Sequence, residues 1–362
     1  MGNTTNSNNT CFLAATDHDE SSSSTEPQQQ YVHIPIYNSR NNSAVPSMSG
    51  EQSIQEVKLS LKSKIFLLLI PNLWLVLLIE NKLCATFTPI FFLPTILLIW
   101  KWWKMPRVNA ELDLIVRLYA IGFTTGCLVV LIIETLLTGI FARLCFIDQW
   151  ENYRNSTDQR ILNANRTFGY YTFFALTSYI TASFVEESLK YWAINSVTKT
   201  TANTSGYLMY ALAVALGFST IENIGYLYKA SLSTHKIWEI AALAIFRVCI
   251  STPVHVMSGY LIGIGIIRRD LKQEPIKIWQ ILFLPVFYHG TFDVLLMIHS
   301  SLKNDELGGT AARLIVTLIS VFVILTTELL TIRYQRKKYA INDGDLITLK
   351  HYDNGICNDH LV

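Results

Sequence analysis

The sequence predicts an all-α polytopic membrane protein, a bundle of about eight transmembrane helices behind a disordered N-terminal tail. Three observations predict this architecture. Hydrophobic residues make up 51% of the 362 residues and charged residues only 15%, a composition typical of membrane proteins. The apolar residues gather in runs of about 20, the length that a helix needs to cross a bilayer. Residues 1–60 are instead rich in Asn, Ser and Gln and carry too little apolar surface to fold alone.

The apolar runs follow the tail in close succession. They lie at 65–80, 83–103, 116–146, 168–195, 206–228, 237–267, 278–300 and 311–333. The first contains Pro71, and the third and sixth are longer than a straight crossing needs, which predicts tilted or extended helices. We therefore divide the chain into the disordered tail at 1–60, a polytopic transmembrane domain at 61–335 with a motif core at 168–300, and a short C-terminal tail at 336–362.

The basic residues predict the orientation of the bundle. They cluster before the first run, after the second, between the sixth and seventh, and after the eighth. Eight crossings put all four clusters on one face, which the positive-inside rule makes cytosolic, so both termini are expected in the cytosol. The loop at 147–167 would then lie on the other face; it holds two glycosylation sequons but also three arginines. The sequence does not indicate which membrane holds the protein.

Ionisable and polar side chains interrupt four successive runs near their middles. They are Glu186, Glu187 and Lys190 in an EExxK pattern, Glu222 and Asn223 in GFSTIEN, Arg247 and His255 in the sixth run, and His289 and Asp293 in an HxxxD pattern. Charges inside a bilayer are costly and mark functional sites by default. Because all four runs carry them at similar depth, a packed bundle could gather these groups in one buried cavity.

The spacing of these residues predicts local contacts. Residues four apart share a helix face, so Lys190 is expected to neutralise Glu186 and leave Glu187 free. The same spacing lets Asp293 hydrogen-bond to His289 or bind a metal beside it.

Two further residues concern packing around these groups. Gly259, one turn beyond His255, is expected to let a neighbouring helix approach closely. Arg247 needs a counter-charge within the bilayer, and we expect it in Glu134 of the third run.

In their order and placement, EExxK, FxxxEN, a histidine followed four residues later by glycine, and HxxxD resemble the motifs of the PrsW-type intramembrane proteases. These belong to a wider superfamily with the CaaX-processing membrane proteases, which usually have arginine at the position of Lys190, so the PrsW branch is the nearer match. The resemblance covers residues 168–300 and implies an intramembrane endopeptidase that hydrolyses a membrane-protein or membrane-anchored peptide substrate with water activated by glutamate. It implies the bilayer and a membrane-protein substrate as partners, and no nucleic acid.

Carried over residue by residue, the resemblance assigns roles to nine side chains. The catalytic residues would be Glu186, Glu187, His255 and His289; the ligands of a divalent metal such as zinc would be His255, His289, Glu222 and Asp293; the supporting residues would be Lys190, Asn223 and Arg247. Two histidines and a carboxylate form a workable catalytic zinc set. The sequence contains no HExxH motif, so a glutamate–histidine mechanism without metal stays open.

Other interpretations of the same residues remain. An ion- or proton-coupled transporter also needs Glu, His and Asp in the middle of the membrane, although the halves of the chain show no convincing repeat. An inactive protease-like membrane scaffold is a second alternative. A third is purely structural, with a buried Glu–Lys salt bridge and histidines that hydrogen-bond between helices.

Overall fold

The computed structural model describes residues 59–104, 110–146, 168–196, 203–234, 236–301 and 310–341. All of them belong to one compact unit, Glu56–Val362. The tail predicted at 1–60 falls outside these ranges except for its last two residues. Of these, Ser60 caps the first helix by accepting a hydrogen bond from the backbone N–H of Ser63. The predicted loop at 147–167 also lies outside the described residues.

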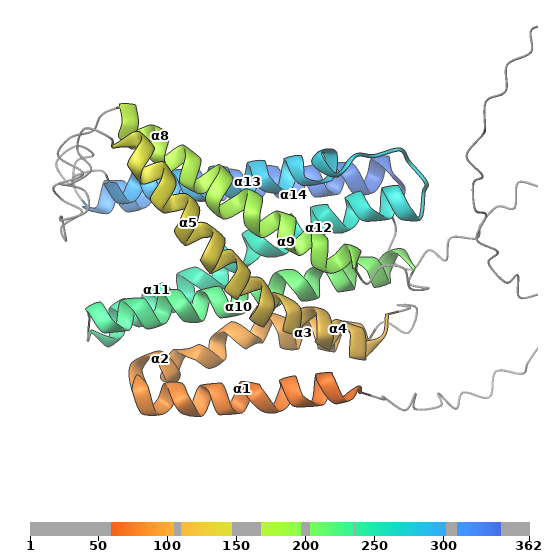
Figure 1. Cartoon of the computed structure of the whole chain (residues 1–362), viewed down its shortest axis with the longest axis horizontal. Helices are drawn as coiled ribbons and strands as arrows, with labels where there is room; N and C mark the ends of the chain where they lie inside the picture. The colour runs from red at the N-terminus through yellow and green to blue at the C-terminus, as the bar shows by residue number, and fades with distance from the viewer. Residues whose placement is uncertain are drawn as a thin grey trace, which may run out of the picture. The chain divides into compact units, whose positions relative to one another are not determined.

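Every element of the described ranges is helical, which confirms the predicted all-α class (Figure 1). In chain order the elements are α1 Leu61–Glu80, α2 Lys82–Phe87, η1 Thr88–Phe92, α3 Leu93–Lys104, α4 Leu112–Ile121, η2 Gly122–Gly126, α5 Cys127–Cys145, α8 Phe168–Leu176, η4 Thr177–Phe184, α9 Val185–Asn195, α10 Thr204–Ser233, α11 Ile237–Phe246, η5 Arg247–Ser251, α12 Thr252–Asp270, α13 Ile278–Ser301 and α14 Thr310–Lys338. α14 thus continues to Lys338, into the first residues of the predicted C-terminal tail.

Within the described ranges, seven helical stretches are long and apolar enough to cross a membrane. They match seven of the eight predicted runs. The remaining run, 168–195, is also one continuous helix, through α8, η4 and α9, and it extends about 42 Å, enough to cross a bilayer core of about 30 Å. It is less apolar than the others because it carries Glu186, Glu187 and Lys190. The polytopic architecture is therefore confirmed, and the least apolar crossing is the one that brings the paired glutamates.

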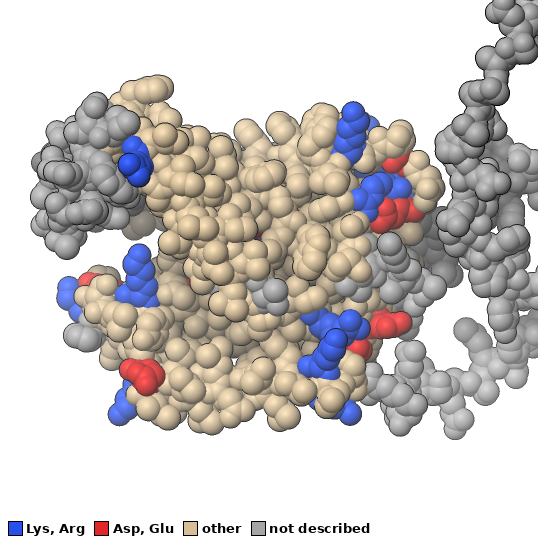
Figure 2. Space-filling view, viewed as in Figure 1, with Lys and Arg blue, Asp and Glu red and all other residues tan. Residues whose placement is uncertain are grey.

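The helix termini meet at two ends of the bundle. Four contacts join helix termini at one end. The start of α4 contacts α1 through Ser63 Oγ and Asp113 Oδ1, at 2.6 Å, and α10 through Glu111 N and Tyr210 Oη, at 3.0 Å. The end of α12 contacts α9 through Arg269 Nη2 and Asn195 Oδ1, at 2.6 Å, and the end of α14 through the Arg268 guanidinium, 3.7 Å over the Tyr339 ring. The basic residues at the start of α1 and at the ends of α3, α12 and α14 share this end, which is called the basic end below. Figure 2 shows a broad band of uncharged residues between the two ends. That the basic end faces the cytosol stays a prediction.

Helix α10 is the most buried of the crossing helices, and glycines allow its close packing. A Cβ atom at Gly217 would collide with the backbone carbonyl of Tyr119 in α4. A Cβ at Gly259 would lie 2.6 Å from the Cβ of Ala215, so α12 also approaches α10 closely, as predicted from the sequence. Small residues of this kind let membrane helices pack backbone to backbone. The contacts fix α10 between α4 and α12, with Glu222 and Asn223 held against α12.

Two widened π-helical segments stand directly before the elements that carry the predicted site. η4 precedes Glu186 and Glu187 in α9, and η5 begins with Arg247 and precedes His255 in α12. Hydroxyl groups accompany both segments: Ser183 Oγ donates to Ser178 O at 2.7 Å, and Thr252 Oγ1 donates to Arg247 O at 3.1 Å. π-helical turns are rare and frequently occur at functional sites. Each turn of this kind changes the face on which the following side chains lie.

Candidate active site

The predicted site residues come together where α9, α10, α12 and α13 pack against one another. Glu187 and Lys190 are fully buried, and Glu186, His255 and His289 retain at most 5% of their surface. The convergence expected from similar depth along four runs is therefore found in the structure.

Glu187 links Lys190 of its own helix to His289 of α13. Its Oε1 accepts a hydrogen bond from Lys190 Nζ at 2.6 Å and lies 2.7 Å from His289 Nδ1. Since a carboxylate can only accept, Nδ1 carries the proton, and in the neutral form of this tautomer Nε2 keeps its lone pair. The predicted pair of Lys190 with Glu186 is present but long, at 3.8 Å between Nζ and Oε2. The expectation that Glu187 is left free is wrong, because the ammonium group makes its short contact with Glu187, three residues away in the chain.

Glu186 is the carboxylate of the pair without a short contact to a cation. Its Oε2 has no hydrogen-bond partner among the described residues, and it lies 3.8 Å from His255 Nδ1 and 3.8 Å from His289 Nε2. A buried carboxylate oxygen costs free energy when it makes no hydrogen bond. Glu187 Oε2 also lacks a hydrogen-bond partner, but Glu186 Oε2 is the oxygen that lies near both histidines, so a water molecule, a metal ion or a substrate bound between the rings would satisfy it.

His255 is held by a second carboxylate. Its Nε2 lies 2.7 Å from Glu222 Oε2, and its Nδ1 lies 3.1 Å from Lys190 Nζ. The ammonium can only donate, so Nδ1 accepts, and Nε2 carries the proton toward Glu222. Each histidine thus points one N–H at a glutamate and its lone pair into the cluster. This is the arrangement in which carboxylates orient metal-binding histidines.

Arg247 supports Glu222 rather than Glu134. Its Nη2 lies 2.9 Å from Glu222 Oε2, and its Nε donates to Asn223 Oδ1 at 2.6 Å. The predicted Arg247–Glu134 pair is therefore wrong. Glu134 of α5 instead lies beside Glu186 and within electrostatic reach of Asp293, so it belongs to the cluster itself.

Asp293 lies farther from His289 than a hydrogen bond between residues four apart would require. Its Oδ2 lies 3.5 Å from His289 Nε2, longer than a good hydrogen bond. About one fifth of the side chain is exposed, as for Glu222, whereas Glu187 and Lys190 are fully buried. The cluster is therefore closed on the α9 side and most accessible beside Glu222 and Asp293.

The donor set fits a divalent metal ion. Glu186, Glu187, His255 and His289 each offer one ligand atom, and these atoms lie within 4.8 Å of one another. This group differs from the expected ligand set, in which Glu222 and Asp293 accompanied the histidines. Two imidazole lone pairs beside the unpartnered Glu186 oxygen match a catalytic zinc set of two histidines and one carboxylate. Lys190 Nζ occupies part of the same space, so it would have to withdraw from His255 when an ion binds.

Sequence reasoning missed one acidic residue near the cluster, Glu328 of α14. Its side chain is fully buried, neither carboxyl oxygen has a hydrogen-bond partner among the described residues, and it is within electrostatic reach of Glu187 and Lys190. The signal was present in the sequence, because a lone glutamate in the apolar stretch TTELLT is an intramembrane charge.

Comparisons with known proteins agree with this geometry. The sequence model of one family, described as "PrsW family intramembrane metalloprotease", matches residues 112–326, more than half of the chain. The match is wider than the 168–300 range of the motifs, because it includes the third crossing and Glu134.

Two curated relatives carry the name "Protease PrsW". The protein of Clostridioides difficile (strain 630) is 30% identical over 148 residues, which cover 39% of this chain and 60% of the relative. The protein of Geobacillus kaustophilus (strain HTA426) is 30% identical over 92 residues, which cover 25% of this chain and 37% of the relative. The chain thus spans less than two thirds of the length of either relative, and no solved structure matches it. From the extent of the family match, the chain belongs to the PrsW family of intramembrane metalloproteases.

Proposed function

We propose that this chain is an intramembrane endopeptidase of PrsW type that hydrolyses a membrane protein or a membrane-anchored peptide. One observation carries the proposal: Glu186, Glu187, His255 and His289 form a single buried cluster inside the residues that match the family. Two adjacent carboxylates within a bilayer are costly, and a purely structural role would need only the one that pairs with Lys190.

Glu186 is the proposed general base. Its free Oε2 lies 3.8 Å from a nitrogen of each histidine, so a water molecule placed among the three atoms would lie between a proton acceptor and two polar rings. Glu186 takes a proton from this water while the water oxygen attacks the scissile carbonyl carbon. The same carboxyl group then gives the proton to the departing amine. General-base catalysis of this kind contributes roughly a hundredfold to ten-thousandfold in rate.

The remaining groups position the reacting atoms. Glu187, held by Lys190, fixes the His289 ring with its lone pair toward Glu186, and Glu222, held by Arg247, does the same for His255. A divalent ion such as zinc would be held by the two imidazole nitrogens with a carboxylate of the cluster, and it would supply Lewis-acid polarisation of the water and the carbonyl. Asp293 supports this arrangement from the accessible side, and the buried Asn223 supports it by accepting a hydrogen bond from Arg247.

A polypeptide would reach the cluster from the side of Glu222 and Asp293. These two carboxylates are about one fifth exposed, whereas Glu186, Glu187 and Lys190 are buried by α9 and its neighbours. An extended segment of a membrane-anchored substrate fits this approach better than a folded helix, because the scissile carbonyl must come within hydrogen-bonding distance of Glu186.

The test compares new protein N-termini in cells that contain the wild type or single variants at equal abundance. Mass spectrometry of terminal peptides from the membrane fraction should reveal cleavage products that the wild type forms and that Glu186→Gln and His289→Ala do not. Glu239→Gln is the matched control, because Glu239 lies at the start of α11 and pairs with an exposed lysine away from the cluster. Termini that are the same with wild type and Glu186→Gln would contradict the proposal and favour the transporter or the scaffold.

A further inference from the structure

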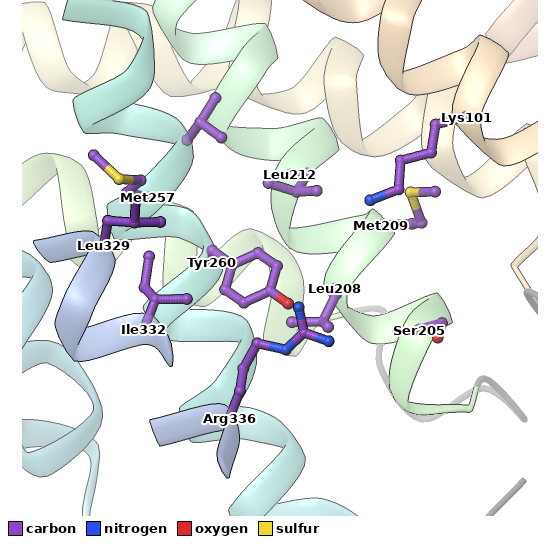
Figure 3. Close-up of a pocket in the computed structure, with 11 residues that line it drawn as sticks. Lys101, Ser205, Leu208, Met209, Leu212, Met257, Tyr260, Leu329, Ile332 and Arg336 are labelled. Carbon is purple, nitrogen blue, oxygen red and sulfur yellow. The ribbon is translucent and has the colours of Figure 1, made fainter. Parts of the chain in front are cut away.

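A second site lies near the basic end of the bundle, in a cavity of about 240 Å³ among α3, α10, α12 and α14 (Figure 3). Its wall is mostly apolar and includes Leu208 and Leu212 of α10, Tyr260 of α12 and Leu329 of α14. The volume corresponds to about eight groups of the size of a water molecule, at about 30 Å³ each. The cavity could therefore hold part of one hydrocarbon chain.

The polar residues of the cavity stand at the helix ends. Lys101 comes from the end of α3, Ser205 from the start of α10 and Arg336 from the end of α14. Figure 3 shows the Tyr260 hydroxyl and the Arg336 guanidinium pointing toward one another, and the Lys101 ammonium reaching toward α10. Two cations and no acidic side chain are among the residues that line this cavity.

Polarity falls with depth along the cavity. Leu212 and Leu329 each stand seven residues further into their helices than Ser205 and Arg336, which is about 10 Å along the helix axis. A phospholipid in the adjacent leaflet has the same order, with its phosphate at the surface and its acyl chains directed inward. Basic pockets between membrane helices on the cytosolic side are known binding places for anionic lipid headgroups.

We infer that this cavity binds an anionic phospholipid, with its phosphate between Lys101 and Arg336 and one acyl chain along Leu212 and Leu329. The two cations at the helix ends, Lys101 and Arg336, favour an anionic headgroup, and the apolar wall favours a lipid over a free anion. Lys101, Leu329 and Arg336 lie outside residues 112–326. The site is therefore built partly from segments that the family match does not include.

The cavity also adjoins the candidate active site through shared helices. Val256 and Met257 line it and directly follow His255, and Leu329 directly follows Glu328. A lipid that fills the cavity would bind only the state in which α10, α12 and α14 are packed together as in this structure. Binding of this kind stabilises the packed state by mass action.

The test measures retention of lipid by the detergent-purified full chain, using native mass spectrometry and thermal melting. The probes are phosphatidylserine and phosphatidylcholine with the same acyl chains, and inorganic phosphate. We expect phosphatidylserine to bind and to raise the melting temperature, phosphatidylcholine to bind at least tenfold more weakly, and phosphate to have no effect. The double variant Lys101→Gln with Arg336→Gln should bind phosphatidylserine about thirtyfold more weakly, from about 1 kcal/mol for each basic residue.

Matched variants separate the cavity from general attraction to a basic surface. Lys104→Gln with Arg333→Gln removes the same charge from the same two helices, but neither residue lines the cavity, so binding should stay within about twofold of the wild type. Leu212→Trp keeps both cations and fills the apolar part, so it should weaken retention of the lipid.

Four results would overturn the inference. They are equal binding of the two phospholipids, equal losses in the two double variants, stabilisation by inorganic phosphate alone, and unchanged lipid retention in Leu212→Trp. Loss of substrate cleavage in Leu212→Trp without loss of lipid would assign the cavity to the substrate instead. Because lipid retention does not depend on proteolysis, failure of this inference is distinguishable from failure of the proposed enzyme activity.

Discussion

Replacing each glutamate of the pair by glutamine should separate stability from turnover: Glu187→Gln should lose stability, and Glu186→Gln should lose turnover while it keeps its stability. Glu187 Oε1 makes two short contacts, at 2.6 Å to Lys190 Nζ and 2.7 Å to His289 Nδ1, whereas Glu186 has no contact with either residue shorter than 3.8 Å. Glu187→Gln therefore removes the main counter-charge of a fully buried ammonium group. Glu186→Gln removes a carboxylate with an unpartnered oxygen.

The distances set the expected magnitudes. Coulomb attraction falls with distance, so Glu186 at 3.8 Å offers Lys190 about two thirds of the attraction that Glu187 offers at 2.6 Å. Removing one partner of a buried ion pair costs about 3–5 kcal/mol, and we expect the lower end for Glu187→Gln because Glu186 and the glutamine oxygen remain. For Glu186→Gln we expect less than about 1 kcal/mol of destabilisation, because relief of a buried carboxylate oxygen that makes no hydrogen bond offsets the lost attraction to Lys190, whose short contact with Glu187 remains.

Two measurements on purified protein decide the matter: the free energy of unfolding in mixed detergent micelles, and the cleavage rate of a membrane-anchored substrate per folded molecule. Glu186→Gln should keep the stability and lower the rate by about a hundredfold or more. Glu187→Gln should lose stability, and Glu239→Gln should change neither quantity. A Glu186→Gln protein that is as destabilised as Glu187→Gln but fully active would show that both glutamates are structural, and the assignment of the base would be wrong.

The other predictions concern metal, packing and topology. Purified protein should carry about one equivalent of a divalent metal, and His255→Ala or His289→Ala should lower it in elemental analysis; retention should also weaken at low pH, because ligands must be deprotonated. Metal-free protein that still cleaves substrate would contradict this. Glu328→Leu should raise the free energy of unfolding by about 1 kcal/mol, since it removes an unsatisfied buried group, and a loss would contradict that account. Gly217→Ala should lower it by about 1–3 kcal/mol through a clash with α4, measured by the same unfolding assay, and wild-type stability would contradict the close packing. In a eukaryotic host the loop at 147–167 should accept glycan while an N-terminal tag stays cytosolic; protease protection of that tag in sealed vesicles would reverse the topology.

Most of the fold was predictable because the bilayer permits few solutions. A chain that crosses hydrocarbon must satisfy every backbone hydrogen bond within a helix, so apolar runs of sufficient length predict helices directly. Pro71 did not end α1, which runs unbroken from Leu61 to Glu80. The helix ends were less predictable, as α14 shows by continuing through the basic residues to Lys338. Those residues are charged, and Arg336 and Lys338 contact Ile341, Tyr334 and Tyr339, so the apolar pattern contains no information about where the helix ends.

The members of the site were predictable, but their pairing was not. Lys190 stands three residues from Glu187 and four from Glu186, and both spacings place residues on the same helix face. The choice depends on His289, which comes from another helix and adds a second short contact to Glu187. In the same way Arg247 lies at the start of η5, which packs against α10, and so contacts Glu222. Sequence separation gives the faces of one helix and not the partners that other helices bring.

The charge balance of the cluster limits what the site can be. Six carboxyl groups of the described residues each lie within electrostatic reach of at least one other: Glu134, Glu186, Glu222 and Asp293 in one group, and Glu328 beside Glu187. Only Lys190 and Arg247 balance them with a fixed positive charge, and each makes its short contact with one carboxylate. An isolated carboxylate in a low-dielectric interior is very costly, so the remaining groups need protons, an imidazolium or a divalent cation. A scaffold built for stability would gain nothing from this surplus, since apolar residues of similar volume would be cheaper to bury. A site that must take a proton from water and return it to an amine does gain from it, because each group that gives up its proton can then accept another. The excess of acid over base around Glu186 therefore argues for proton transfer at this cluster, with or without a metal ion.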